Sequence, residues 1–172
     1  MSNSRSADRT FHMTWQDPKA TAAKGLALGG LAYIQALIRG ELQPPPITLL
    51  MGFRMTEAEP GRVVMVLEPS ERTYNPLGTV HGGVAATVLD SVMGCAVHTT
   101  LPPGRGYTTL EIKVNYVRAM SEQTGQVRAE GTVVHAGRST AVAEGRLVDG
   151  TGRVYASGST TCLLFDLPAA KG

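Results

Sequence analysis

The sequence predicts a single α+β domain in which an antiparallel sheet packs against one long buried helix. First, segments with the character of strands are joined by short turns rich in Gly and Pro. Second, the stretch from Gly82 to Val97 is apolar, small or hydroxylated except for one charge. Third, 172 residues can bury one sizeable core but not two. Two strands, a long apolar helix and four further strands form an order typical of this class.

The chain is expected to begin with a weakly ordered stretch, residues 1–15, and then a helix. Asp17 and Pro18 suit the N-cap and the first helical position. A helix from there to about Arg39 places apolar residues at three- and four-residue steps, despite several glycines, and so forms a packing stripe: Leu26, Leu31, Ile34, Leu37 and Ile38. The prolines at 44–46 then form a stiff connector, so residues 1–46 comprise tail, helix and connector.

The main domain is expected to span residues 47–166, followed by a short tail, 167–172. Its elements are a hairpin, a helix over 79–98 and four more strands. The hairpin strands are expected at about 50–57 and 62–67, and the later ones at 107–118, 126–135, 139–148 and 154–165. Met51, Phe53 and Met93 could line a substrate pocket, although such side chains more often belong to the core.

The composition argues against several classes of protein. The net charge is only +2, the basic residues are scattered and aromatic residues make up 5%, which does not suit a nucleic-acid-binding protein. No apolar run reaches the roughly 18 residues that span a bilayer, and the polar start does not resemble an export signal. Cys95 and Cys162 lack metal-ligand or redox spacing and are expected to be buried free thiols. We expect a cytoplasmic protein with no metal or redox cofactor, and neither nucleic acid nor membrane as a partner.

Asp90 is the one formal charge between Gly82 and Val97. On a helical wheel it shares its side with small residues, Gly83, Ala86 and Gly94, while another face carries Val84, Val88, Val92 and Cys95. A carboxylate in such a setting costs several kcal/mol unless it is paired, and no Arg or Lys on this helix can pair with it. Asp90 is therefore either a buried anchor for a group on another strand or subunit, or a catalytic carboxylate.

The start of the same helix offers a second candidate for catalysis. Gly82 and Gly83 present free N–H groups at the positive end of the helix dipole, where a carbonyl oxygen could be polarised; alternatively they only permit a tight turn. His81 could contact substrate or make a structural hydrogen bond. Gly82 and Asp90 are eight positions apart, roughly 12 Å along a helix. If both are catalytic, they come from two subunits of a symmetric dimer with antiparallel helices.

The segment Asn75-Pro76-Leu77-Gly78-Thr79-Val80-His81-Gly82-Gly83, with Asp90 nine residues after His81, resembles the phenylacetyl-CoA thioesterase-like branch of the hotdog-fold thioesterase superfamily. The resemblance runs from about Leu49 to Phe165. It implies a hotdog fold, an acyl-CoA substrate and dimers that usually pair into tetramers. It further implies that the Gly82 N–H holds the thioester carbonyl, that Asn75 positions substrate or water, and that the partner's Asp90 acts as general base or nucleophile. Coenzyme A would be part of the substrate, so no separate cofactor is expected.

The resemblance also implies a Ser or Thr near Asp90 at the start of the following strand. Counting forward from Asp90 favours Thr108, and counting back from Tyr116 favours Thr109. Alternation along the strand aligns Thr108 with Leu110, Ile112 and Val114, and Thr109 with Glu111, Lys113 and Asn115. We prefer Thr109. The strand end, Tyr116-Val117-Arg118-Ala119, departs from the family, which often has a proline after the arginine.

Gly137-Arg138-Ser139 resembles the segment that receives the nucleotide portion of coenzyme A; an ordinary hairpin turn with a solvated Arg is the alternative. Two other functions remain open. A non-catalytic acyl-CoA sensor would bind without releasing thiol. A hydratase or dehydratase would need a His and Asp pair; none is visible around Asp90, and the distant His98 or His135 is the open alternative.

Overall fold

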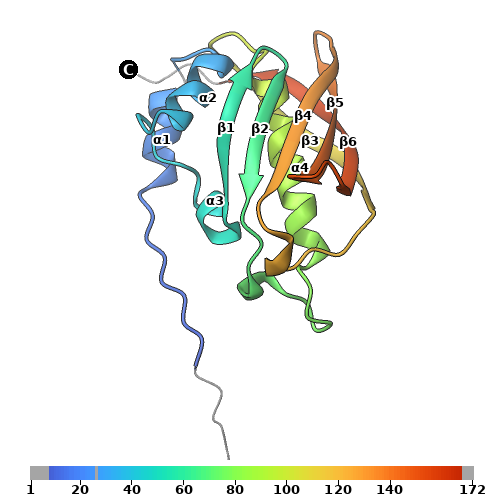
Figure 1. Cartoon of the computed structure of the whole chain (residues 1–172). Helices are drawn as coiled ribbons and strands as arrows, with labels where there is room; N and C mark the ends of the chain where they lie inside the picture. Colours follow the sequence, from blue (N-terminus) through green and yellow to red (C-terminus); the bar gives the residue numbers. More distant parts are fainter. Residues whose placement is uncertain (1–7, 26, 168–172) are drawn as a thin grey trace, which may run out of the picture.

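The computed structural model describes residues 8–25 and 27–167 (Figure 1). The expectations for residues 1–7, for Leu26 in the apolar stripe and for tail residues 168–172 lie outside these residues. Within them, no helix is long and apolar enough to cross a membrane.

Six antiparallel strands form one sheet, in the order β1-β2-β4-β5-β6-β3. Figure 1 shows α4 (Gly82–His98) behind this sheet, whose strands curl around it. The predicted α+β class is confirmed, and the strand predictions differ from the structure by a few residues at their ends. The strands are β1 Phe53–Glu59, β2 Arg62–Leu67, β3 Arg105–Tyr116, β4 Val127–Ala136, β5 Thr140–Asp149 and β6 Val154–Asp166.

A row of glycines lets α4 lie very close to the sheet. Gly131, Gly145 and Gly158 are aligned across β4, β5 and β6. A Cβ atom on Gly131 would lie 2.6 Å from the carbonyl oxygen of Val92, so only glycine fits there. The helix residues on this side are fully buried: Val88, Leu89, Val92 and Met93. The predicted burial of the helix is therefore confirmed over this side, and Met93 belongs to the core together with Phe53 and, at its edge, Met51.

The expected single N-terminal helix is wrong: the chain forms α1 (Pro18–Gly25) and α2 (Gly30–Ile38). Gly29 is extended, and the Gly30 N–H donates to the carbonyl of Leu101. Any side chain at Gly30 would collide with the backbone of His98, so the glycines that weaken a helix also allow the chain to pass the end of α4. Ile34 of α2 is buried, as the packing stripe predicts.

The expected strand from about residue 50 is also wrong at its start, because α3 (Pro46–Met51) precedes β1. Pro46 stands in the first turn of this helix, where its missing N–H costs no hydrogen bond. Gly52 ends α3 with a φ of 80°, a conformation that favours glycine. The proline run is thus partly a connector and partly a helix start.

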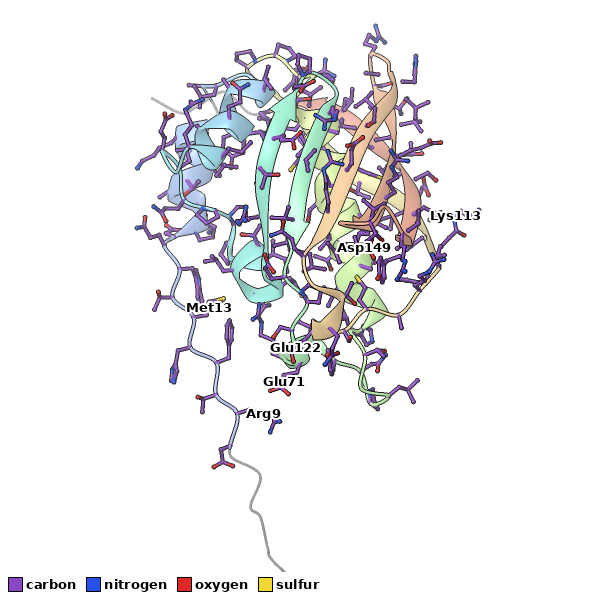
Figure 2. The ribbon with its side chains drawn as sticks, in the orientation of Figure 1. Arg9, Met13, Glu71, Lys113, Glu122 and Asp149 are labelled. Carbon is purple, nitrogen blue, oxygen red and sulfur yellow. The ribbon has the colours of Figure 1, made fainter. Side chains whose placement is uncertain are left out.

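Residues 8–17 form an arm without helix or strand that ends on η1 (Glu71–Thr73). The Arg9 Nε lies 2.6 Å from Glu71 Oε1, and the Arg72 guanidinium lies 4.7 Å from the centre of the Phe11 ring. Figure 2 shows Arg9 near Glu71 at the end of the arm, with Met13 further along it. Both ion-pair partners are exposed, so solvent screens this contact and it contributes little to stability.

Candidate active site

Asp90 has one hydrogen-bond donor in the described structure. The Thr109 hydroxyl of β3 donates to Asp90 Oδ1 over 2.8 Å. Asp90 itself is half-buried. Among residues 8–25 and 27–167, Asp90 Oδ2 accepts no hydrogen bond, and no Lys or Arg side chain forms an ion pair with Asp90. The carboxylate is thus held through one oxygen while the other remains available.

A β-bulge explains why Thr109, rather than Thr108, faces Asp90. The register of β3 against β6 shifts between Thr109 and Glu111, leaving Leu110 without a partner. An extra residue in a strand reverses which side chains point inward beyond it. Thr109 therefore lies on the inner face of the strand together with Ile112 and Val114. Strict alternation along the sequence, which takes no account of the bulge, aligned Thr108 with these two residues. Thr108 is exposed.

His81 caps the start of α4. Its Nδ1 accepts a hydrogen bond from the Gly83 N–H over 2.8 Å, so Nδ1 carries no proton. The His81 N–H donates to the carbonyl of Thr73, while Val80 bonds to Met120 and pairs with Tyr74. These contacts hold residues 79–81 outside the helix, which consequently begins at Gly82 rather than Thr79.

The Gly82 N–H has no acceptor in the part of the chain that the structure describes. Its surroundings include the Tyr116 ring, whose Cε1 would lie 3.2 Å from a Cβ atom at Gly82. A larger residue would press on this ring. Gly82 thus presents a backbone donor at the positive end of α4, next to an aromatic side chain.

Asn75 closes the loop that leads to the helix. Its Oδ1 accepts from the N–H groups of Leu77 and Thr79, and its Nδ2 donates to the Thr79 hydroxyl over 3.1 Å. Gly78, with a φ of 78°, completes the turn. The structure therefore gives Asn75 a clear role in shaping the loop, with the exposed Leu77 at its tip.

The structure does not bring all candidate residues together in one chain. Gly82 and Asp90 lie on one helix, roughly 12 Å apart along its axis. Gly137, Arg138 and Ser139 form the β4–β5 turn, where the Arg138 carbonyl accepts from Arg105 at the start of β3. Because β3 begins shortly after α4 ends, this turn lies at the opposite end of the helix from Gly82. A site that uses all of these groups needs a second copy of the chain.

Tyr107 is a neighbour of Asp90 that the sequence did not single out. Its ring packs on Gly94, where a Cβ atom would lie 2.7 Å from Tyr107 Cε2. Burial raises the pKa of Tyr107 well above its ordinary value and raises the pKa of Cys95 to about 12. Both groups therefore stay protonated near neutral pH. A glycine in mid-helix was the one available signal, since it often marks a close approach.

The two histidines left open for a hydratase lie elsewhere. His98 stands between Tyr33 and Tyr107, with ring centroids 5.4 and 5.5 Å away, and burial lowers its pKa. His135 is exposed near the end of β4. No hydrogen bond joins Asp90 to a histidine among the described residues.

Within residues 8–25 and 27–167, no group of three or more His, Cys, Asp or Glu side chains could hold a metal ion. Of the two free thiols, Cys162 is buried as expected, but Cys95 is only half-buried.

Comparison with known proteins places this geometry in a family. The model of the thioesterase superfamily matches residues 77–156. The 1,4-dihydroxy-2-naphthoyl-CoA hydrolase of Listeria monocytogenes is 31% identical over 101 residues, covering 59% of this chain and 80% of the relative. A conserved protein of Pseudomonas aeruginosa has a similar structure, with a TM-score of 0.67, 30% identity and coverage of 71% of this chain and 95% of the other.

A Streptococcus mutans protein solved with bound acetyl-CoA is also similar, with a TM-score of 0.61 and 26% identity. The match covers 67% of this chain and 90% of that protein. These similarities agree with the sheet wrapped around α4 and with the residues from Leu77 onward. The chain belongs to the thioesterase superfamily and has its hotdog fold.

Proposed function

We propose that this protein is an acyl-CoA thioesterase of the phenylacetyl-CoA thioesterase-like branch, in which Asp90 supplies the reactive carboxylate and the Gly82 N–H binds the thioester oxygen. The observation that carries the proposal is the hydrogen bond from Thr109 to Asp90 Oδ1. It orients a carboxylate on an otherwise uncharged helix and leaves Oδ2 for chemistry. Family membership supports a thioester as substrate.

The active unit would be a dimer with two shared sites. β3 is a twelve-residue strand at the edge of the sheet, and its side chains Leu110 and Tyr116 are exposed. A second β3 running antiparallel beside it would satisfy the free edge and set the two α4 helices antiparallel. Asp90 of the partner would then approach Gly82, and the partner's Arg138 turn would lie at the same end. Two such dimers could pair as a tetramer.

Two routes of hydrolysis fit this arrangement. As a general base, Asp90 takes a proton from water while the water oxygen adds to the thioester carbon, and the oxyanion is stabilised by Gly82 N–H. Collapse breaks the C–S bond, and the departing thiolate recovers the proton from Asp90. As a nucleophile, Asp90 instead displaces the thiolate and forms an anhydride, which water then hydrolyses. Asn75 would shape the loop beside the carbonyl, and His81 would orient the amide groups.

The decisive test is release of free thiol from acyl-CoA esters by Asp90→Asn. The variant keeps the shape of the side chain but loses its basicity, so kcat should fall by about a thousandfold. Unfolding by urea should remain within about 1 kcal/mol of wild type. Unchanged turnover would refute the role of Asp90, and tight acyl-CoA binding without thiol release by wild type would indicate a sensor instead.

Asn75→Ala provides a graded comparison. Removal of its side chain loosens the loop before Gly82 without touching the carboxylate, so kcat should fall less than in Asp90→Asn.

A panel of substrates should include aryl and short- to medium-chain acyl-CoA esters, with a naphthoyl-CoA because the Listeria relative carries that substrate in its name. Dilution of the wild type below the dimer dissociation constant should abolish activity, since each site needs two chains.

A further inference from the structure

The β4–β5 turn, Gly137-Arg138-Ser139, is held from two other strands of the sheet. The Leu164 N–H of β6 donates to the carbonyl of Ser139 over 2.8 Å. The carbonyl of Arg138 accepts from a side chain instead, since Arg105 Nη2 donates to it over 2.8 Å. Arg105 belongs to β3, which β6 separates from β5 in the sheet. Arg105 thus reaches the turn from beyond its neighbouring strand.

Arg105 is itself partly buried and held at its inner end. Its side chain is 27% exposed, and its Nε is buried and lies 3.3 Å from Asp166 Oδ1, without the geometry of a hydrogen bond. The Asp166 side chain is exposed, so solvent screens this ion pair. The hydrogen bond to the Arg138 carbonyl is therefore the contact that defines where the guanidinium lies.

This hydrogen bond also sets the direction of the next N–H along the chain. In a planar trans peptide, the C=O of one residue and the N–H of the next point in opposite directions. Arg105 draws the Arg138 carbonyl toward β3, so the Ser139 N–H points away from β3. Ser139 and Arg138 are exposed. Among the described residues, this N–H has no acceptor and the Arg138 side chain has no ion-pair partner.

The exposed turn therefore offers a backbone N–H, the Ser139 hydroxyl and the Arg138 guanidinium. Donors of these kinds bind phosphate groups, and charge-assisted hydrogen bonds are the strong ones. A turn that is already ordered binds more tightly than a mobile one, because less conformational entropy is lost on binding. The contact that orders the turn should therefore affect the affinity for a phosphate-bearing ligand.

Resting on the proposed function, we infer that Arg105 is a positioning residue for the nucleotide portion of coenzyme A. Arg105 acts through the turn: it holds the Arg138 carbonyl on the inner side and so presents the Ser139 N–H to a phosphate group. Four positions of β3 separate Arg105 from Thr109, the partner of Asp90, roughly 13 Å along a strand. Arg105 therefore affects binding of the nucleotide rather than cleavage of the thioester.

The test compares phenylacetyl-CoA with S-phenylacetylpantetheine, which lacks the nucleotide and its phosphates. Arg105→Met keeps a long stem but removes the donors, so KM for the CoA ester should rise about tenfold while kcat stays within about twofold. For the pantetheine ester, kcat/KM should stay within about twofold of wild type. Arg105→Lys keeps the charge without the planar fork and should recover part of the loss.

Titration of coenzyme A itself gives a reading that does not depend on the acyl group. Its Kd should rise about tenfold in Arg105→Met. Arg39→Met is the matched control, because Arg39 pairs only with the exposed Glu41 beside it, and it should leave both Kd and KM unchanged. In an Arg138→Ala background, Arg105→Met should raise Kd by about threefold instead of tenfold, since residues that act through one turn are not additive.

Equal tenfold effects in both backgrounds would show that Arg105 attracts the phosphates directly, and would overturn the inference. Unchanged KM and Kd in Arg105→Met, or equal losses for the CoA and pantetheine esters, would overturn it as well. Absence of thiol release from every ester by wild type would count against the proposed function. The Kd series with coenzyme A would still decide the role of Arg105, so the two failures are distinguishable.

Discussion

The two sides of α4 obey different constraints. The side that faces β4, β5 and β6 is fully buried and lies against glycines that leave no space for a Cβ atom. The side that carries Asp90 is half-buried and faces the edge strand β3. The first side therefore determines how the helix packs, and the second is free to carry a charge.

This difference shows how one helix can serve both stability and chemistry. Close packing fixes the helix axis, because backbone contacts tolerate little adjustment. A fixed axis in turn holds Asp90 within reach of the Thr109 hydroxyl. Substitutions on the sheet side should therefore affect stability first, and substitutions on the Asp90 side should affect activity first.

The largest expected effect is that of Gly131→Ala. Its new methyl group would lie 2.6 Å from Val92 O, and because the atoms that it meets belong to the backbone of α4, the helix would have to move. We expect a loss of about 3 kcal/mol in the free energy of unfolding, measured with urea. Gly150→Ala in the β5–β6 turn, with no atom within 4 Å, should change it by less than about 0.5 kcal/mol. Equal stabilities for the two variants would show that the close approach is not required.

A smaller effect is expected at Thr109. Thr109→Val keeps the shape of the side chain but removes the donor to Asp90, and hydrogen bonds to charged groups contribute about 1.5–3 kcal/mol. We expect kcat to fall roughly tenfold to a hundredfold, and Thr109→Ser to restore most of it. Thr108→Val should have the smaller effect of the two, since Thr108 is exposed. The reverse order would contradict the position of the bulge.

The smallest effect concerns alkaline pH. The Cys95 thiol ionises near pH 9.0 when unfolded, but desolvation raises its pKa to about 12 in the folded chain. The folded state therefore binds the proton more tightly, and stability is complete below pH 9 and declines above it. Between pH 8 and pH 10 we expect a loss of about 1 kcal/mol. Cys95→Ala should make this decline shallower, although Tyr107, whose pKa is also raised, would keep part of it. A decline as steep as in wild type would exclude Cys95 as a cause.

Much of the fold could be predicted because its signals are local. β2 was predicted residue for residue, since Arg62–Leu67 is a run of strand formers after a Pro-Gly turn. The helix around Asp90 was predicted from its apolar content. The break before Gly30 was not, because it depends on what the chain meets in space, the end of α4. The helix at Pro46 was missed although its signals are local, Pro46 in the first turn and Gly52 at the end.

The candidate site shows the same limit. Asp90, Gly82 and His81 could be selected from residue type and spacing, but the choice between the two threonines required the register of β3 against β6. Tyr107 gave no signal of its own. A pocket lined by Val117 and Tyr155 also joins residues 38 positions apart in the chain, and no periodicity connects them.

The bulge at Leu110 means that β3 consists of two segments of opposite phase. Removing Leu110 would bring the two segments into one phase, because Glu111, which pairs with Thr161, would then follow Thr109 directly. Tyr107 and Thr109 would stay inward, and Ile112 and Val114 would stay in the core. A single-codon deletion here would thus straighten the strand and leave both the carboxylate partner and the hydrophobic interior in place.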